Sequence, residues 1–426
     1  MQRSGSTVPA SPPACTNCST DRWGRVGVST AKLFTMQRWS NWSGKVTARP
    51  AAIHFVKSET DAVALAAATA RAGSTIRSVG TAHSHYPLVP TDGTIVDVSG
   101  LSGVISIDAD AKRARVRAGT AIHALGLPLL DAGLGLLNQG DIDRQTIAGA
   151  TATGTHGTGV TLQNLSATVT GLSIATADGD LVRASEDDNR KVWTAARHHL
   201  GAFGVVTDLE LQLRDAYRVR ETGWNATLDE TLETLAEIVH AHRHFEFFWF
   251  PTADNAVIKA TDETDDPAEY PIADEGNRCG WSHEVLSNSR TWPHSEMEYA
   301  VPLEAGPDCL AAIRDLLRRE APEMPFPLEY RTLAADDVWL SVAYERPTAT
   351  ISLHMDARED DEPLFRAAEA VFSDFDGRPH WGKVHYRTGA DMASLHPRWD
   401  DWWDARDTLD PNGVFLNDAL RSLRDR

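Results

Sequence analysis

The sequence lacks three features that would place it in a specialised class of protein. It has no excess of positive charge, because 41 lysines and arginines against 60 aspartates and glutamates give a formal net charge of -19. This balance argues against nucleic acid or an anionic membrane as a main partner. No stretch approaches the ~18 consecutive apolar residues of a membrane span. Four cysteines in 426 residues are too few for a disulfide framework, so we expect an ordinary globular protein of two or three domains.

The N-terminal segment has little patterned sequence. Residues 1–35 are rich in serine, threonine and proline and contain no continuous apolar segment, so they do not read as a secretory signal. We expect a disordered extension, with Met36 as an alternative start, and a cytoplasmic protein. Cys15 and Cys18 form a CxxC, but no second CxxC exists to complete a zinc site. We therefore expect a free thiol pair and no metal there.

The first half of the patterned sequence mixes strands with short helices. Residues 53–79 read as strand, helix and strand, with the spacing of a capping box at Ser58–Asp61 and a helix end at Gly73. The turn at Asp178-Gly179 predicts a hairpin over 169–185. Further strands are expected over 94–98, 104–108 and 113–119, and a helix over 120–132. Residues 201–213 are expected to form a glycine-rich bend that leads into another strand.

The character of the chain changes near residue 215. The following ~180 residues contain most of the tryptophan and phenylalanine, including FEFFWFP at 245–251, and an amphipathic helix is predicted over 308–320. We interpret this region as a second α+β domain. Near the C-terminus, Trp399, Trp402 and Trp403 recur close to helical spacing, which favours core packing over a cofactor site.

Two segments have the composition of ligand-binding loops. A β-branched run ends at Gly80, and the turn GTAHS (80–84) that follows offers successive backbone amides with small side chains. Residues 138–159 are packed with glycine, alanine and threonine and have almost no large apolar group. Such residues let backbone approach a flat or charged ligand. A flexible linker is the alternative, but it would favour serine, proline and charge.

Six motifs in the same order resemble one family of flavoproteins. They are GTAHS (80–84), TATGTHGTG (151–159), GAFGVV (201–206), MEYAVP (297–302), HWGK (380–383) and LDPNGVFLND (409–418). The chain, from about Asn41 to its end, is similar to the sugar 1,4-lactone oxidases and alditol oxidases of the vanillyl-alcohol-oxidase fold.

The resemblance implies an α+β fold in four segments. A PCMH-type FAD-binding domain of two subdomains is expected over 36–215, after the extension at 1–35. A substrate or cap domain with an antiparallel sheet is expected over 216–395. The C-terminal segment 396–426 is then expected to return to the flavin domain.

The resemblance also implies how FAD is held. In covalent members, the histidine of this turn is bonded to the C8-methyl of the isoalloxazine ring, and His83 matches that position; non-covalent FAD is the alternative. Ala82 stands where the family usually has glycine, and a positive φ would strain an alanine. His156 is interpreted either as a flavin or substrate contact or as a loop-stabilising hydrogen bond. The residues expected to bind the cofactor are Gly80, Thr81, Ala82, His83, Ser84, Ala148, Gly149, Thr153, Gly154, His156, Gly157, Gly159 and Val206.

Oxidation of an alcohol requires an acceptor for the hydroxyl proton and positive charge near the developing alkoxide. Glu329 and Arg331 are two apart, which on a strand places both on one face. By resemblance they join His354 and Lys383 in a polar cluster on the substrate side of the flavin. We hypothesise that His354 accepts the proton, that Arg331 is oriented by Glu329 and binds the substrate oxygen, and that Lys383 stabilises the reduced flavin near N1. A salt bridge without chemistry and a core histidine are the alternatives.

Three functional readings follow from these residues. The first is an FAD enzyme that oxidises a polyol or sugar lactone with O2 as acceptor, because Ala148, Gly149 and Ala150 leave room for O2. The second is a dehydrogenase that uses another acceptor. The third is either a flavin-binding protein without turnover, which the presence of Glu329, Arg331, His354 and Lys383 argues against, or a tailoring oxidoreductase that acts on a sugar-bearing secondary metabolite. No HExxH or paired-ligand spacing supports a zinc hydrolase, and no metal is expected.

Overall fold

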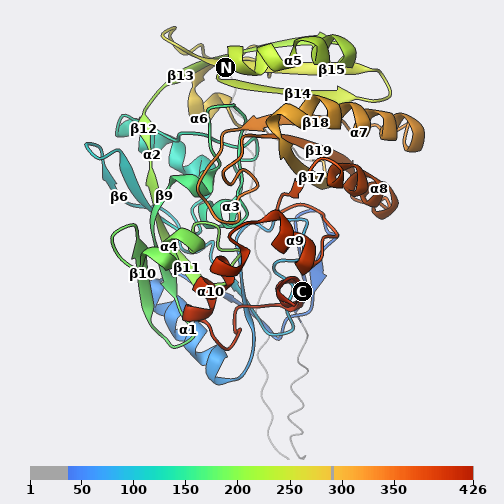
Figure 1. The fold of residues 1–426 in the computed structure, drawn as a ribbon. Helices are drawn as coiled ribbons and strands as arrows, with labels where there is room; N and C mark the ends of the chain where they lie inside the picture. Colours follow the sequence, from blue (N-terminus) through green and yellow to red (C-terminus); the bar gives the residue numbers. More distant parts are fainter. Residues whose placement is uncertain (1–36, 289–291, 426) are drawn as a thin grey trace, which may run out of the picture. The chain divides into compact units, whose positions relative to one another are not determined.

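The computed structural model describes residues 37–288 and 292–425 (Figure 1). The expectations for residues 1–35, for the Cys15–Cys18 pair and for Met36 lie outside this range. Within it, no helix combines the length and the apolar character that crossing a membrane would require.

A three-stranded parallel sheet follows a short N-terminal hairpin, which is described below. Its order is β3 (Ala52–Phe55), β5 (Thr94–Asp97) and β4 (Ile76–Val79), and helix α1 (Glu59–Arg71) connects β3 to β4. Ser58 caps α1, because its side chain accepts a hydrogen bond from the Asp61 backbone N–H at 3.0 Å. The helix ends before Gly73, which has a positive φ of 65°. Both ends agree with the sequence prediction.

A five-stranded antiparallel sheet forms the second layer of this half. Its order is β10 (Leu181–Ser185), β9 (Val169–Ala175), β11 (Val205–Gln212), β7 (Arg113–Arg117) and β6 (Val104–Asp108). The helix predicted over 120–132 is a 3-10 turn (Ile122–Leu125) followed by α2 (Gly126–Asp131). The small-residue segment 138–159, expected as a loop, contains the short helix α3 (Ile147–Ala152), because the Thr146 side chain caps its first turn.

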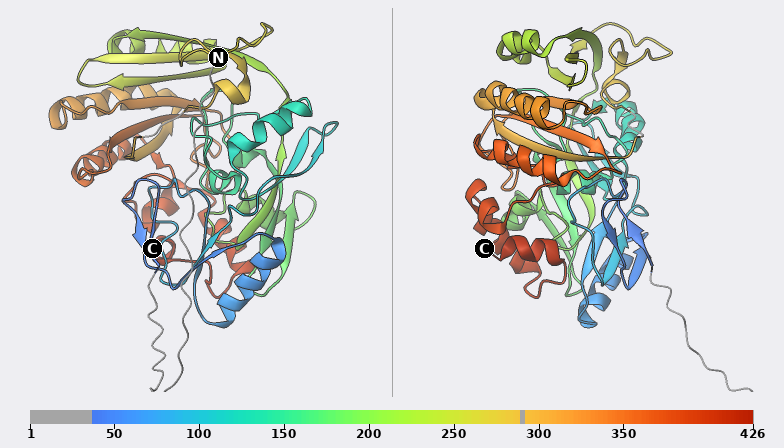
Figure 2. Two further views of the ribbon diagram at one scale, coloured as in Figure 1. Left: turned by 180° about the vertical axis from the view of Figure 1, so that it is seen from behind. Right: turned by 90° about the vertical axis from the view of Figure 1, so that its right-hand side faces the viewer.

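An eight-stranded, wholly antiparallel sheet dominates the second half. In spatial order its strands are β16 (Cys279–Trp281), β13 (Arg218–Ala226), β15 (Asn255–Thr264), β14 (His244–Phe250), β18 (Leu328–Leu333), β19 (Thr348–Asp356), β17 (His294–Pro302) and β20 (Arg378–Pro379). Helices α5 (Leu228–Ala241), α7 (Gly306–Glu320) and α8 (Glu362–Ser373) cover one face, as Figures 1 and 2 show.

The alternation along the strands decides which side chains face those helices. On β14, Phe245, Phe247 and Trp249 are fully buried in the core that the helices share with the sheet. Glu246, Phe248 and Phe250 therefore lie on the opposite face. We call this second face the open face of the sheet.

The C-terminal helices contact the first half of the molecule. They are α9 (Gly389–Leu395), α10 (Trp399–Leu409) and α11 (Asp418–Arg424). The Trp402 indole N–H donates to the His198 carbonyl at 3.0 Å. Trp399, Trp402 and Trp403 belong to the core around the five-stranded sheet, as the prediction of core packing required. Further along, the Asn417 amide donates to the carbonyls of Pro87 and Pro90, both at 2.9 Å.

A small N-terminal hairpin, β1 (Trp39–Ser40) and β2 (Thr47–Ala48), contacts both halves. The Lys45 ammonium lies 2.6 Å from a carboxylate oxygen of Asp361, just before α8. At the tip of the hairpin, the Trp42 backbone N–H donates to the Ala82 carbonyl at 2.8 Å. The hairpin thereby links the turn at 80–84 to the start of α8.

Candidate active site

Two connected cavities lie where the open face meets the loops of the first half. The larger has a volume of about 500 Å³ and the smaller about 90 Å³. His83, Ser84, Gln145 and Thr153 line both, so the two cavities meet at the end of the 80–84 turn.

Glycine, alanine, serine and threonine make up much of the lining of the smaller cavity, and larger side chains such as Trp39, Arg77 and Tyr86 complete it. A Cβ atom added to Gly80 would lie 2.1 Å from the Thr146 hydroxyl oxygen, so the turn and α3 approach each other only because position 80 is glycine. Of the residues predicted to bind the cofactor, those that line it are Gly80, Thr81, Ala82, His83, Ser84, Ala148, Gly149, Thr153 and Val206.

Ala82 has a φ of 57°, in the left-handed region, which is the conformation that would strain an alanine. Hydrogen bonds from the tip of the β1–β2 hairpin stabilise Ala82 in this conformation. Trp42 donates its backbone N–H to the Ala82 carbonyl, and the Asn41 amide donates to the Ser84 carbonyl at 3.0 Å. These bonds fix the carbonyls on either side of His83, so the surrounding structure enforces the strained conformation.

The His83 imidazole lies at the junction of the two cavities. Its ring centre is 5.5 Å from that of Trp42. Burial, together with the positive charge of Lys383 and the nearby His294, lowers the pKa of His83 to about 4. The ring is therefore neutral at physiological pH and has a nitrogen lone pair available.

The second predicted loop divides between the two cavities. His156 lines the larger cavity rather than the smaller one. Gly154 and Gly159 line neither; a Cβ on Gly154 would lie 2.8 Å from the His198 ring, and Gly159 has a φ of 139°. Gly157 borders a separate small cavity of about 20 Å³. These three glycines allow close chain packing at their positions.

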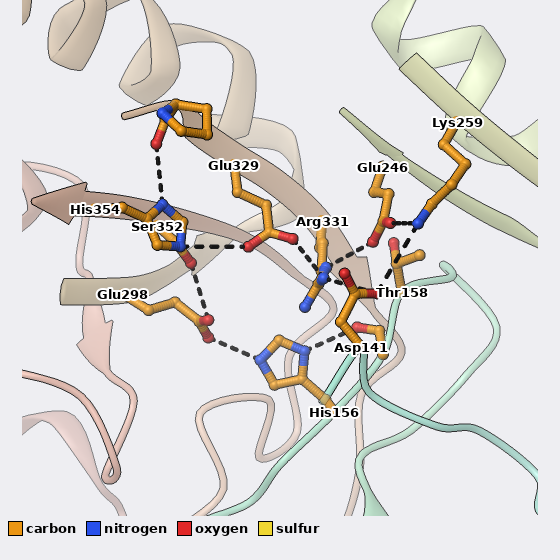
Figure 3. Close-up of polar contacts among 12 residues, drawn as sticks. Asp141, His156, Thr158, Glu246, Lys259, Glu298, Glu329, Arg331, Ser352 and His354 are labelled. Atoms are coloured by element: carbon orange, nitrogen blue, oxygen red, sulfur yellow. Dashed lines mark hydrogen bonds and ion pairs between the residues drawn. The ribbon is translucent and has the colours of Figure 1, made fainter. Parts of the chain in front are cut away.

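The open face presents polar side chains in cross-strand rows (Figure 3). In the first row, Val257 on β15 is opposite Phe248 on β14, which is opposite Glu329 on β18, followed by Ser352 on β19 and Glu298 on β17. In the next row, Lys259 is opposite Glu246, and Arg331 follows on β18. His354 on β19 is opposite Glu296 on β17. Register therefore brings together residues far apart in the sequence.

Arg331 is held by three carboxylates. Its Nε donates to Glu246 at 2.7 Å, its Nη2 lies 3.3 Å from Asp141, and it forms an ion pair with Glu329. Burial alone would lower the pKa of Arg331, but these anions raise it well above the ordinary value. Burial raises the pKa of Glu329 to about 7, against the opposing effect of Arg331. The guanidinium is thus permanently charged and fixed in orientation.

The two ring nitrogens of His354 have different environments. Its Nδ1 lies 3.0 Å from the Pro327 carbonyl and donates to it, so Nε2 faces Glu296 at 3.6 Å and Glu329 at 3.9 Å. Burial alone would lower the pKa of His354, but the Glu296 and Glu329 carboxylates raise it.

Lys383 and His156 both contact carboxylates of β17. Lys383 forms an ion pair with Glu296. His156 places Nε2 2.7 Å from Glu298 and Nδ1 2.8 Å from the Gly157 carbonyl. Burial alone would lower the pKa of His156, but Glu298 and the carbonyl raise it. His156 thus lines the larger cavity and also stabilises its own loop, so both sequence interpretations describe part of its environment.

Several charged residues of this site were absent from the sequence prediction. They are Asp141, Glu246, Lys259, Glu296 and Glu298. One signal could have revealed Glu246, because a carboxylate inside the aromatic run FEFFWF needs a charged partner on the same face of its strand.

Some of these groups are also close enough together to hold a metal ion. The sets are His85, His294 and Glu296; His156, Glu298 and His380; and Glu296, Glu329 and His354, with candidate ligand atoms within 4.8 Å of one another. Glu296 is already paired with Lys383, and Glu298 with His156. Ion pairing therefore accounts for their proximity.

Comparisons with known proteins agree with this arrangement. The family described as D-arabinono-1,4-lactone oxidase matches residues 209–277 and 270–423, and the FAD binding domain family matches residues 50–185. L-gulono-1,4-lactone dehydrogenase of Mycobacterium tuberculosis is 38% identical over 424 residues, covering 90% of this chain and 98% of that protein. Alditol oxidase of a Streptomyces species is 31% identical over 419 residues, covering 91% and 99%. A solvent-stable cholesterol oxidase shares the fold, with a TM-score of 0.79 at 19% identity over 91% of this chain and 97% of that one.

The chain therefore belongs to the D-arabinono-1,4-lactone oxidase family. It is an FAD-linked oxidoreductase with the predicted α+β fold, a PCMH-type FAD-binding domain and an antiparallel cap sheet.

The residues present fit FAD. Position 80 has no space for a Cβ atom, so the turn can take its observed path only with glycine there. The small side chains that follow in the turn then allow its backbone amides to approach a pyrophosphate. The cavity opens at His83 toward the charged open face, where the reacting end of the cofactor would meet a substrate.

Proposed function

We propose that this enzyme oxidises an alcohol carbon of a polyol or of a sugar 1,4-lactone. The main support for the proposal is that His354 and Arg331 line the cavity that meets the FAD turn at His83. The names of the two relatives, a lactone dehydrogenase and an alditol oxidase, support the same substrate class.

Each polar residue has a role in this reaction. When bound, FAD supplies the acceptor for the hydride that leaves the alcohol carbon. His354 accepts the hydroxyl proton at Nε2, because Nδ1 is held by the Pro327 carbonyl. Arg331 donates to the substrate oxygen, and Glu329 keeps the guanidinium in place. Lys383 supplies positive charge beside the cofactor, which offsets the charge that accumulates on reduction.

We also propose that FAD is covalently attached through His83. The low pKa of this imidazole leaves it neutral, so its nitrogen lone pair could bond to the C8-methyl carbon. That carbon would lose a C–H proton, and the two electrons released would reduce the flavin, which an acceptor such as O2 would then reoxidise. Its position between the two cavities supports the proposal. Non-covalent FAD in the same cavity is the alternative.

O2 is the proposed electron acceptor, and H2O2 the product. Ala148 and Gly149 line the smaller cavity with little bulk, which leaves space for O2. A dehydrogenase with a different acceptor is the second candidate, favoured by the name of the relative that is 38% identical.

Different segments of the chain contribute cofactor binding and catalysis. Residues 36–215 hold the cofactor, residues 216–395 form the cap that supplies the catalytic side chains, and residues 396–426 return to the flavin domain. The contacts of Trp402 and Asn417 described above support this division.

The decisive experiment adds candidate substrates to the FAD-loaded protein without oxygen. Xylitol, sorbitol and a series of aldono-1,4-lactones are mixed with the protein, and loss of the oxidised-flavin absorbance is recorded. Rapid bleaching by at least one compound is expected, and no bleaching by any would contradict the proposed function. Admitting air then separates oxidase from dehydrogenase by peroxide formation. Acid precipitation separates covalent from free FAD, because only covalent flavin stays in the pellet.

A further inference from the structure

The larger cavity has an apolar wall that the proposed chemistry does not use. On β14, Glu246 contacts Arg331, but the next two residues on the open face are Phe248 and Phe250. Val257, opposite Phe248 on β15, and Phe326, just before β18, extend this wall. We call these four residues the apolar wall.

The apolar wall adjoins the catalytic residues directly. Phe248 is opposite Glu329 in the sheet. Phe326 precedes Pro327, whose carbonyl holds His354. Val257 is 40% exposed, so the wall runs from the reacting groups to the edge of the cavity that opens to solvent.

A free polyol or sugar lactone presents mainly hydroxyl groups, which suit such a surface poorly. Nearly every carbon of these compounds carries an oxygen, and a hydroxyl placed against phenylalanine or valine gives up hydrogen bonds to water without replacement. An alkyl or aryl group, by contrast, gains free energy in proportion to the apolar area it loses to water. Solvent-accessible apolar side chains grouped at a cavity are typical of a binding site.

We propose that the physiological substrate carries an apolar alkyl or aryl group, attached at the end remote from the oxidised carbon, and that this group binds against the apolar wall. The inference rests on the proposed function, and it deepens it: the substrate is an apolar conjugate of a polyol or lactone rather than the free sugar derivative.

The test compares a hexono-1,4-lactone with its 6-O-methyl, 6-O-butyl and 6-O-benzyl ethers. Bleaching of FAD without oxygen is followed at several concentrations, which makes the result independent of the electron acceptor. The substrate concentration that gives half the maximal bleaching rate, which serves as KM in this comparison, should fall by roughly two- to fourfold for each methylene that reaches the wall. The rate at saturation should change little, because the reacting end is the same.

Variants assign the effect to the wall. Val257→Ser and Phe250→Ser should bring the ratio of kcat/KM for the butyl ether over the parent lactone toward one. Phe55→Ala is the matched control, because Phe55 is an exposed aromatic residue on β3 that lies outside the lining of the cavity. It should keep the full ratio.

The outcomes separate the two proposals. If the parent lactone bleaches FAD and the ethers have an equal or higher KM, the apolar wall does not select the substrate and only this inference fails. If no compound of the series or of the polyol panel bleaches FAD, the proposed function fails and this inference with it. A preference for the ethers that survives Val257→Ser and Phe250→Ser would also overturn the inference.

Discussion

The turn at 80–84 and the open face of the eight-stranded sheet border the same pair of cavities, but they present different chemical groups to them. The turn contributes backbone amides, a glycine that excludes even a methyl group and one uncharged imidazole. The open face contributes titratable side chains that contact one another across five strands, β14, β15, β17, β18 and β19. Cofactor binding at the turn therefore depends on shape, whereas the chemistry at the open face depends on charge.

The largest expected effect tests the shape side of this comparison. Gly80→Ala places a methyl group against Thr146, which cannot move away because its hydroxyl caps α3. We expect a folded protein that retains little FAD, measured by flavin absorbance after gel filtration. Gly135→Ala is the matched control, because a Cβ there approaches no other atom closer than 3.6 Å. Full FAD content in Gly80→Ala would break the comparison.

The next effect tests the charge side. His354→Ala should lower kcat by ~10²–10⁴ through loss of the proton acceptor, while FAD content stays at the level of the parent protein. Stopped-flow bleaching with a good substrate measures the rate. The exposed His54 on β3 provides the control variant His54→Ala, which should react normally. A variant at 354 that loses FAD would show that the two regions are not separable.

Glu246→Gln sharpens the comparison within the open face. Glu246 positions Arg331 and also pairs with Lys259 at 2.5 Å. Loss of its charge should lower kcat/KM by roughly ten- to a hundredfold, with the greater part of the change in kcat. Glu263→Gln, which weakens an ion pair with Arg214 at the surface, should leave both constants unchanged. Equal effects of the two variants would argue for general destabilisation instead.

The pH dependence reports on the same charges. His354 must be neutral to accept a proton, and its pKa is raised above 6.5, so kcat/KM should rise about tenfold per pH unit up to that raised pKa. Removal of a neighbouring anion lowers the pKa of an imidazole. Glu296→Gln should therefore move the acidic limb to lower pH, and Glu304→Gln, at an exposed site, should not. A limb unmoved by Glu296→Gln would assign it to another group.

The smallest effect concerns the strained residue of the turn. At φ 57°, Ala82 costs about 1–2 kcal/mol, and glycine would relieve this at an entropic cost of roughly 0.5–1 kcal/mol. Ala82→Gly should therefore raise the melting temperature by a degree or two with FAD content unchanged. Ala68→Gly, on the exposed side of α1, should lower it. A loss of FAD in Ala82→Gly would show that the alanine itself shapes the site.

The same contrast explains what could be predicted from sequence. The turn is contiguous, so GTAHS reveals its chemistry in five residues, and the strand period of two predicts that Glu329 and Arg331 share a face. Glu246 lies 85 positions before Arg331, and Glu298 lies 142 positions after His156. Which residues become partners depends on the register between neighbouring strands. Where a long connection joins two strands, the sequence does not determine that register. α3 was missed because alanine, glycine and threonine are compatible with both loop and helix.

The hairpin at the start of the described chain has a consequence for the order of assembly. Its Lys45 is separated by 316 residues from Asp361, and the segment after His83 is held by Asn417 near the other end of the chain. Contacts this remote in sequence close late during folding. During synthesis, the FAD-binding turn at 80–84 would therefore lack these supporting contacts until the C-terminal helices have emerged from the ribosome. Binding of FAD would then be one of the last steps in the maturation of the protein.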